Sequence, residues 1–471
     1  MLHRRAVLVG ALAASFGGFR AYADAPSDAA VQAMLQERVG KDRESTGIVA
    51  VVSDHAGSRL FAFGAPGTPD NGKLDGDTVF EIGSITKVLT ALILADMAER
   101  SEVAMTDPVA KYLPASVKVP EYQGKPITLL DLATYTSGLP NMPDNFAPKD
   151  PLNPFADYTV DQLYAFLSGY TLKYEPGTHY EYANLGFGLL GHALARRADK
   201  SYETLVVERI CDPLFLRSSR ITLTEDMRSR LAQGHNQRLE PTPPWDFAAL
   251  AGCGAVRSTA NDLTVFLEAC LGRRQTPLRA PLARLLETRR PTGLRGHEMG
   301  LGWFTSSNHG DEIAWKSGAT GGFLTFIGFS TTSRRGSIVL SNAFRHDPTD
   351  LGMHLINPDF RPTAIGALFH SLKQRRLITV SPQVLAVYAG TFAGSPAVGV
   401  TVRVAVRVRG SRLFVQATGE DEFEAFPETE TRFFVHDADA DITFFRDADG
   451  KVNSLVVHHE DEPDWRAQRV Q

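Results

Sequence analysis

Cysteine is scarce in this sequence: Cys211, Cys253 and Cys270 are the only three in 471 residues. Three cysteines cannot form a complete disulfide framework, and none stands in a CxxC or Cys/His spacing typical of a zinc site. One bridge stays open in an oxidising compartment, but small apolar side chains buried in the core are the better interpretation. We therefore expect no structural metal.

Long apolar runs and an excess of basic charge are also missing. No segment after the N-terminal residues holds 18 consecutive apolar residues, so no transmembrane helix is expected. There are 49 Lys+Arg against 54 Asp+Glu, whereas a general nucleic-acid binder carries a basic excess. A Gly-rich phosphate loop and a G-x-S-x-G elbow are absent as well. We expect neither a nucleic-acid partner nor a cofactor, and an α/β-hydrolase is disfavoured.

The N-terminal residues are typical of an export signal. Arg4 and Arg5 precede a modest apolar stretch at residues 6–19, and Ala21-Tyr22-Ala23 provides a small-x-small cleavage site. The paired arginines fit the twin-arginine route and equally the charged region of an ordinary signal. We expect a signal peptide at residues 1–23 and a periplasmic or secreted protein.

Hydrophobic patterning predicts an α/β (α+β) domain at residues 24–375. Residues 85–100 are apolar nearly all round, as in a buried helix. Strand patterns near the start of the domain return near its end, with helical patterns between, so the first and last strands are expected to share one sheet. These strand patterns lie at residues 47–53, 59–63, 312–316, 323–329 and 337–340.

The C-terminal residues, 384–471, change character after a linker expected around Ser381-Pro382. Short alternating segments separated by turn residues predict a small antiparallel β-barrel or sandwich. The segments lie at residues 402–408, 413–417, 432–435, 442–445 and 454–457.

Three short motifs contain residues suited to nucleophilic catalysis. Ser84 and Lys87 are three apart where the buried helix begins, so they share a helix face. A serine hydroxyl becomes a good nucleophile only when a base takes its proton, and a buried lysine can be that base. The alternative is that Ser84 caps the helix and Lys87 lies at the surface.

The second motif is Tyr180-Glu181-Tyr182-Ala183-Asn184. Tyr182 and Asn184 are two apart in an extended segment and point the same way. A tyrosine near cations can act as a general acid or base. The alternative is that Asn184 caps the following helix and Tyr182 only packs.

The third motif, Lys316-Ser317-Gly318-Ala319, ends a strand. Lys316 can hold an anionic group or favour the ionised form of Tyr182, Ser317 can bond the same anion, and Gly318 leaves room for a substrate. The N–H groups of Ala319 and Ser84 can form an oxyanion hole. The alternative is a polar strand end followed by a glycine turn.

Together these motifs resemble those of the class C β-lactamase and penicillin-recognising serine hydrolase family. FEIGSITK, ITLLDLATYTSGLP at residues 127–140, YAN and KSGATGGF stand in that family's order. The resemblance covers roughly residues 49–342 and implies a β-lactamase/transpeptidase-like fold with an antiparallel sheet and a helical subdomain. The C-terminal segment loosely resembles the lipocalin-like barrel of some members, and self-association through it is an open option.

The resemblance also implies roles for the motif residues. Ser84 would be the acylated nucleophile, Lys87 its base, Tyr182 the proton relay, Asn184 a substrate ligand and Lys316 the support of Tyr182. The implied substrate is a small molecule or peptide: a β-lactam or a D-Ala-D-Ala-type amide. An esterase or D-amino-acid amidase on the same scaffold is the alternative, and a catalytically inactive binding protein is a third hypothesis.

The sequence departs from the family at three places. Ser317 stands at the usual threonine, the loop after Leu139-Pro140 lacks the glutamine of class C β-lactamases, and the chain beyond Ser341-Asn342 does not follow their substrate-carboxylate loop. These departures weaken the prediction of a resistance enzyme more than that of a serine acyl hydrolase.

Overall fold

The computed structural model describes residues 25–67, 72–293, 296–308, 311–359, 378–395, 402–418, 422–435, 440–447, 449–458 and 464–470. The signal peptide expected at residues 1–23 lies outside this range. Within the described residues, no helix has both the length and the apolar character needed to cross a bilayer.

The first domain is built on an eight-stranded antiparallel sheet in the order β2-β1-β14-β13-β12-β11-β10-β9. The first and last long strands share this sheet, as expected from the sequence, and they pair directly, so that Ile48 lies opposite Ser341. The bounds are β1 Gly47–Asp54, β2 Gly57–Gly64, β9 Arg290–Pro291, β10 His297–Met299, β11 Phe304–Asn308, β12 Asp311–Ala319, β13 Leu324–Ser330 and β14 Gly336–Ser341.

Helices form the rest of this domain, together with three two-stranded sheets. The α-helices are α1 Asp28–Gln36, α2 Thr86–Glu99, α3 Leu129–Ala133, α4 Val160–Gly169, α5 Asn184–Ala198, α6 Tyr202–Val206, α7 Asp212–Leu214, α8 Glu225–Ser229, α9 Ala260–Cys270, α10 Arg279–Glu287 and α11 Thr349–Ile356. Shorter 3₁₀ or π turns are η1 Glu37–Lys41, η2 Gly83–Ile85, η3 Val109–Tyr112, η4 Val207–Cys211 and η5 Ala251–Cys253. The short strands pair as β3 Val79–Glu81 with β8 Arg257–Thr259, β4 Glu121–Tyr122 with β5 Lys125–Pro126, and β6 Gly234–His235 with β7 Pro241–Thr242.

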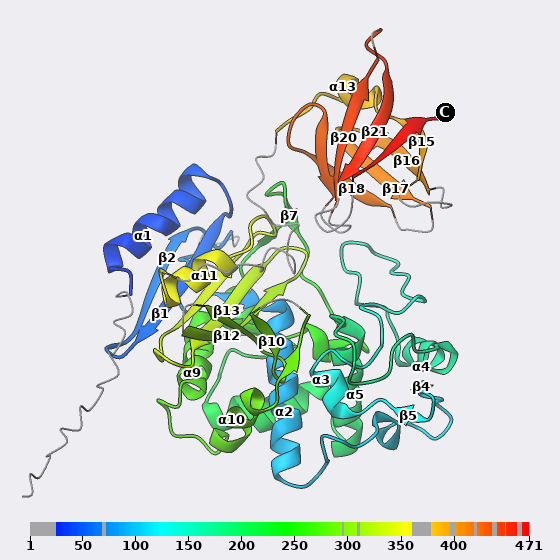
Figure 1. Ribbon diagram of the computed structural model, residues 1–471. Coiled ribbons are helices and arrows are strands. Elements are labelled where there is room, and N and C mark those ends of the chain that lie inside the picture. Colours follow the sequence, from blue (N-terminus) through cyan, green and yellow to red (C-terminus); the bar gives the residue numbers. More distant parts are fainter. Residues whose placement is uncertain are drawn as a thin grey trace, which may run out of the picture.

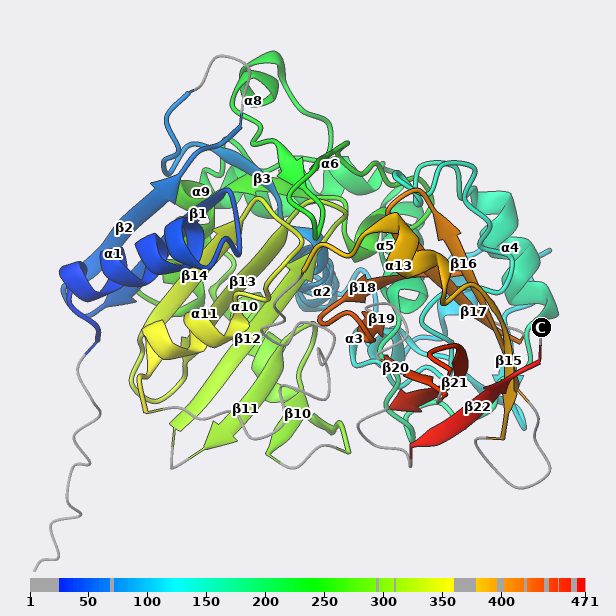
Figure 2. The ribbon, with the colours of Figure 1, turned by 90° about the horizontal axis from the view of Figure 1, so that it is seen from above.

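The sheet is covered on both faces. Helices α1 and α11 pack on one face, and α9 lies on the other with α10 and α2 behind it (Figure 1, Figure 2). All eight residues of β1 are buried because the strand lies between these two layers. Helices α3 to α6 form the helical subdomain beside α2.

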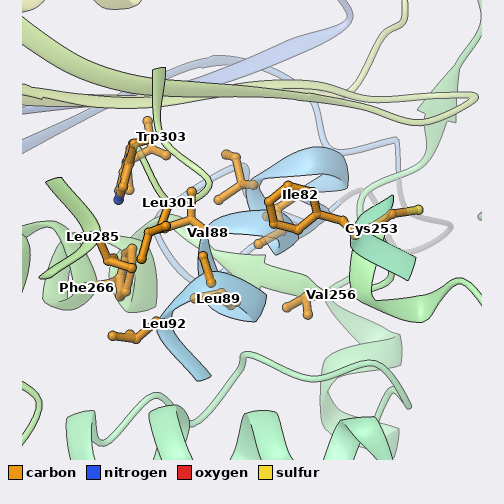
Figure 3. Packing of buried hydrophobic residues seen from close by; sticks show 14 of the residues in the cluster. Ile82, Val88, Leu89, Leu92, Cys253, Val256, Phe266, Leu285, Leu301 and Trp303 are labelled. Carbon is orange, nitrogen blue, oxygen red and sulfur yellow. The ribbon is translucent and has the colours of Figure 1, made fainter. Parts of the chain in front are cut away.

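Helix α2 is the buried helix expected from the sequence. Its side chains Val88, Leu89 and Leu92 lie among residues of α9, α10 and the loop before β11, including Phe266, Leu285 and Trp303 (Figure 3). Burial on nearly every side fixes the helix, and with it the turn that precedes it, against both the sheet and the helical subdomain.

The C-terminal residues form a closed eight-stranded antiparallel barrel, which resolves the choice between barrel and sandwich. Its interior is filled by side chains, with Tyr388, Phe392, Phe433 and Phe444 in mutual ring contact. The strands are β15 Gly390–Gly394, β16 Val402–Arg409, β17 Arg412–Ala417, β18 Phe423–Pro427, β19 Arg432–Val435, β20 Ala440–Arg446, β21 Val452–His458 and β22 Trp465–Arg469.

A short helix occupies the position of the linker expected around Ser381-Pro382. Ser381 caps a short helix, α13 (Pro382–Ala386), by accepting a hydrogen bond from the N–H of Val384, and Leu385 belongs to the barrel core. A serine followed by proline at the first helical position is also a helix start signal, which accounts for the difference.

A hairpin of the first domain contacts the barrel. The β6–β7 loop places Arg238 against Glu424 of β18, with Nη2 2.6 Å from Oε1, and its guanidinium carbon lies 5.5 Å from the ring centre of Phe426. At its other end the hairpin meets the turn after β12: the N–H of His235 donates to the carbonyl of Gly322 at 3.2 Å. The hairpin therefore links the barrel to the end of β12.

Candidate active site

Ser84 lies in a turn whose shape depends on a glycine. Strand β3 ends at Glu81, and the turn η2, which contains Ser84, begins at Gly83 with φ +50° and leads into α2. A Cβ on Gly83 would lie 2.6 Å from the backbone N of Ala319. Glycine is required here both for its left-handed conformation and for the close approach of β12 to the serine turn.

Lys87 is buried and uses three hydrogen bonds to hold its amine beside the serine. Its Nζ lies 2.8 Å from Ser84 Oγ, 2.7 Å from Asn184 Oδ1 and 2.7 Å from the carbonyl oxygen of Cys253. An ammonium group has three donors, and each has a partner. Lys87 is therefore not a surface residue, and Ser84 makes no capping hydrogen bond to the helix.

Tyr182 contacts the serine from the other side. Its hydroxyl donates to Ser84 Oγ at 2.9 Å, and the amines of Lys316 and Lys87 lie 4.7 and 5.1 Å from its ring centre. Burial alone would raise the pKa of this phenol, but the two ammonium groups and the hydrogen bond to Ser84 outweigh it and lower the pKa from 10.0 to about 7. Tyr182 can thus exchange a proton near neutral pH.

Lys316 has no exposed surface and is enclosed by aromatic rings. Its Nζ lies 4.8 Å from the ring centre of Phe304 and donates to the hydroxyl of Tyr135 at 3.3 Å. Burial lowers the pKa of this amine to about 8, with Lys87 acting in the same direction and Tyr182 opposing it. The amine faces the phenol of Tyr182, so it is placed to act on that phenol.

The backbone at the end of β12 lies against the serine turn. A Cβ on Gly318 would be 2.9 Å from the backbone N of Ser84 and closer still to the carbonyl oxygen of Ile82. Any side chain at this position would push the two segments apart. Because Gly318 has no side chain, the two segments that carry the N–H groups of Ser84 and Ala319 can lie against each other, as an oxyanion hole requires.

These groups open onto a cavity of about 390 Å³. Its wall contains Ser84, Tyr182, Asn184 and the end of β12, and three aromatic rings in mutual contact cover another part. The lining residues are Ser84, Asn141, Phe155, Tyr182, Asn184, Trp245, Phe247, Cys253, Gly254, Ser317, Gly318, Ala319, Thr320, Leu324, Phe344 and Asp347.

All eight site residues named from the sequence meet in this region. Asn184 begins α5 without making a capping hydrogen bond and instead accepts from Lys87, so the capping alternative does not describe it. Ser317 lines the cavity beside Gly318 and Ala319. Within the described residues, no group of three His, Cys, Asp or Glu side chains could hold a metal ion, and Cys211, Cys253 and Cys270 are free thiols.

Sequence reasoning missed several groups that shape the site. Tyr135 and Phe304 surround the amine of Lys316, and the acceptor on Cys253 is a backbone carbonyl, which leaves no trace in residue type. Tyr135 stands in the TYTSG segment at φ 55°, an unusual backbone for a tyrosine. The resemblance includes this segment but implies no role for the ring of Tyr135.

Two family models match the chain. Residues 28–355 match the family model described as Beta-lactamase, and residues 374–471 match a domain of unknown function, DUF3471. The D-alanyl-D-alanine-carboxypeptidase/endopeptidase AmpH of Escherichia coli (strain K12) is 31% identical over 312 residues, which is 63% of this chain and 79% of that protein.

Solved structures share the fold of the first domain. A beta-lactamase/D-alanine carboxypeptidase from Yersinia pestis complexed with citrate aligns with a TM-score of 0.58 and 27% identity, over 67% of this chain and 94% of that one. A class C beta lactamase from Rhodobacter sphaeroides aligns with a TM-score of 0.60 and 24% identity, over 69% and 98%, and supports the fold alone. The expected family is confirmed: the chain belongs to the Beta-lactamase family and is a serine hydrolase.

Proposed function

We propose that the protein cleaves β-lactam or D-Ala-D-Ala-type amide bonds through an acyl-enzyme on Ser84. The observation that carries this proposal is the double contact at Ser84 Oγ, with Lys87 Nζ at 2.8 Å and Tyr182 OH at 2.9 Å. With two proton-transfer partners beside a nucleophilic hydroxyl, one partner can take the hydroxyl proton and the other can protonate the leaving group. The similarity to AmpH, a D-alanyl-D-alanine-carboxypeptidase/endopeptidase, supports the choice of amide.

The reaction would proceed in two steps. Ser84 Oγ attacks the carbonyl carbon while its proton passes to the phenolate of Tyr182 or to Lys87 in its neutral form, and the N–H groups of Ser84 and Ala319 donate to the oxyanion. Tyr182 gives a proton to the leaving nitrogen as the C–N bond breaks; on the Lys87 route, the ammonium then returns a proton to the phenolate of Tyr182. A water then attacks the ester carbonyl while its proton passes to the same base, and that base gives the proton to Ser84 Oγ as the C–O bond breaks, which frees the acid and restores the Ser84 hydroxyl. Because the two bases share one cluster, they titrate as a coupled set.

Intact-mass spectrometry after addition of benzylpenicillin tests the proposal. A stable adduct on Ser84 is expected for a penicillin-binding peptidase, and a short-lived adduct with hydrolysed drug for a lactamase. Turnover of nitrocefin, a D-Ala-D-Ala peptide and a p-nitrophenyl ester ranks these against the esterase or amidase alternative. Ser84→Ala is the control and should give no adduct. Labelling of Ser84 by a fluorophosphonate without any amide turnover would point to the esterase.

We also propose that the protein is exported to the periplasm or secreted, on the grounds of residues 1–23. Expression of the full chain should yield a product whose N-terminus follows Ala23. Replacing Arg4 and Arg5 by lysine tests the route. Export should stop if it uses the twin-arginine route and should continue if residues 1–23 are an ordinary signal, because lysine keeps the positive charge. An unprocessed cytoplasmic product would contradict the proposal.

A further inference from the structure

The cavity wall carries almost no formal charge. Among its sixteen lining residues, Asp347 is the only aspartate, glutamate, lysine, arginine or histidine. The two site lysines do not line the cavity: Lys87 and Lys316 have no exposed surface, and their amines already contact Ser84, Tyr182 and their neighbours. A substrate in the cavity therefore meets one carboxylate, the phenol of Tyr182 and no basic side chain.

Asp347 is held in place but forms no ion pair within the described residues. It is 9% exposed, and its Oδ1 accepts a hydrogen bond from the N–H of Thr349 at 2.8 Å. No ion pair joins it to a lysine, arginine or histidine of the described residues; the neighbouring His346, which lies 3.6 Å from Asp350, acts on Asp347 only through its charge. Burial raises the pKa of this carboxyl, and Asp350 adds to the effect, while hydrogen bonding from Thr349 and the charge of His346 oppose it. A carboxylate so placed is stabilised by any cation that enters the cavity.

The rest of the wall suits the same kind of group. Phe155, Trp245 and Phe247 line the cavity as one aromatic cluster, with ring centres 4.7 to 6.3 Å apart. Aromatic faces attract cations, and a ring cluster combined with a carboxylate is the chemistry that recognises an ammonium group. A substrate carboxylate would gain nothing from these rings and would be repelled by Asp347.

We propose that Asp347 is a specificity-determining residue that favours acyl donors bearing an ammonium group and disfavours those bearing a carboxylate at the same position. This inference rests on the proposed function, since it names the charge of the substrate for the same Ser84 site. Asp347 touches the substrate and plays no part in the proton transfers.

Binding of matched anilides to the Ser84→Ala protein tests the inference without turnover. The probes differ only in one substituent, which is trimethylammonium, tert-butyl or carboxylate, placed in one series on the acyl group and in another on the aniline. In at least one series, the trimethylammonium probe should bind more than tenfold tighter than the carboxylate probe by calorimetry. In the Ser84→Ala/Asp347→Asn protein this ratio should fall to within about threefold of one, while the tert-butyl probe reports any general loss of binding.

Two further variants separate charge from structure. Asp347→Glu keeps the charge and should keep the order of the three probes. Asp144→Asn removes an exposed carboxylate from the loop that carries Asn141, outside the cavity wall, and should leave the ratio unchanged. Equal ratios with and without Asp347 in both series would overturn the inference. Failure of Ser84 to be acylated would instead count against the proposed function and leave this measurement intact.

Discussion

The amine of Lys316 is buried and lies 4.7 Å from the ring centre of Tyr182, which is partly buried at the cavity wall. Each alters the protonation of the other, because an ammonium group beside a phenol favours the phenolate, and the phenolate favours the ammonium. The serine hydroxyl is hydrogen bonded to that phenol. The ionisation of a residue 232 positions away in the sequence thereby reaches the nucleophile.

Activity should depend on pH through this pair. Tyr182 has a pKa of about 7 and must lose its proton to act as a base, so kcat/KM should rise through about pH 7. It should fall above about pH 8, where Lys316 becomes neutral and no longer holds the phenolate. Tyr182→Phe should lower kcat/KM by roughly 10²- to 10⁴-fold and remove the rise near pH 7. Tyr180→Phe, which alters a buried phenol without a hydrogen-bond partner in the described structure, is the control. An unchanged profile in Tyr182→Phe would contradict the assignment.

Lys316→Met should move the acidic limb of the profile. Removing a cation that stabilises the phenolate raises the pKa of Tyr182, so the rise in kcat/KM should shift by at least about one unit to higher pH. A pH series with a chromogenic ester measures the shift, and Lys200→Met, which alters an exposed lysine, is the control. A limb that stays near pH 7 would show that Lys316 does not set the ionisation of Tyr182.

Gly318→Ala should disturb the oxyanion hole. The new Cβ would lie 2.9 Å from the backbone N of Ser84, so the serine turn must move away from β12. The loss of one oxyanion donor typically costs roughly 10²- to 10³-fold in kcat, and we expect a loss of that order. Gly169→Ala is the control because a Cβ there meets nothing within 4 Å. Thermal unfolding of both variants separates a local effect from misfolding; a fully active, folded Gly318→Ala protein would refute the role.

Glu81→Gln should change how stability depends on pH. Burial raises the pKa of this carboxyl from 4.5 to about 7, although Arg257, 3.3 Å away, opposes the shift. The folded state therefore binds the proton of Glu81 more tightly than the unfolded state does. The stabilisation that this protonation gives the folded state is fully present below about pH 4.5 and is lost as pH rises to about 7. The difference in free energy of unfolding between wild type and variant should change by about 3 kcal/mol over this range, at about 1.4 kcal/mol per unit. Urea unfolding at several pH values measures it, with exposed Glu225→Gln as the control. A difference that does not vary with pH would disprove the shift.

Arg238 and Glu424 should be energetically coupled across the two domains. Their side chains are 23% and 17% exposed, so the pair is better shielded from water than a surface ion pair. A double-mutant cycle with alanine should give a coupling energy of about 1 kcal/mol in the free energy of unfolding. Arg407 and Glu422 form an ion pair wholly within the barrel. A second double-mutant cycle on this pair is the control, because it measures a coupling that does not cross between the domains. If Arg238 and Glu424 act additively, the contact does not hold the barrel to the hairpin.

The sequence predicts the main elements that carry the site because each is indicated by a local pattern of residues. A buried helix preceded by Ser84, and strand patterns at both ends of the domain, are enough to expect Ser84 and Lys316 in one place. The surroundings of Lys316 could not be derived in this way. Tyr135 and Phe304 reach it only through packing between elements far apart in the chain, and nothing in their own sequence neighbourhood marks that contact. Asp347 lies beyond the segment in which the motifs gave guidance.

The pairing of β1 with β14 has a consequence for biosynthesis. The central sheet cannot close until residue 341 has left the ribosome, because Ile48 finds its partner Ser341 only then. Contacts separated by nearly 300 residues form slowly, since a long loop must be ordered before they add stability. A nascent chain that already contains the nucleophile therefore has no assembled active site until the whole first domain has been synthesised.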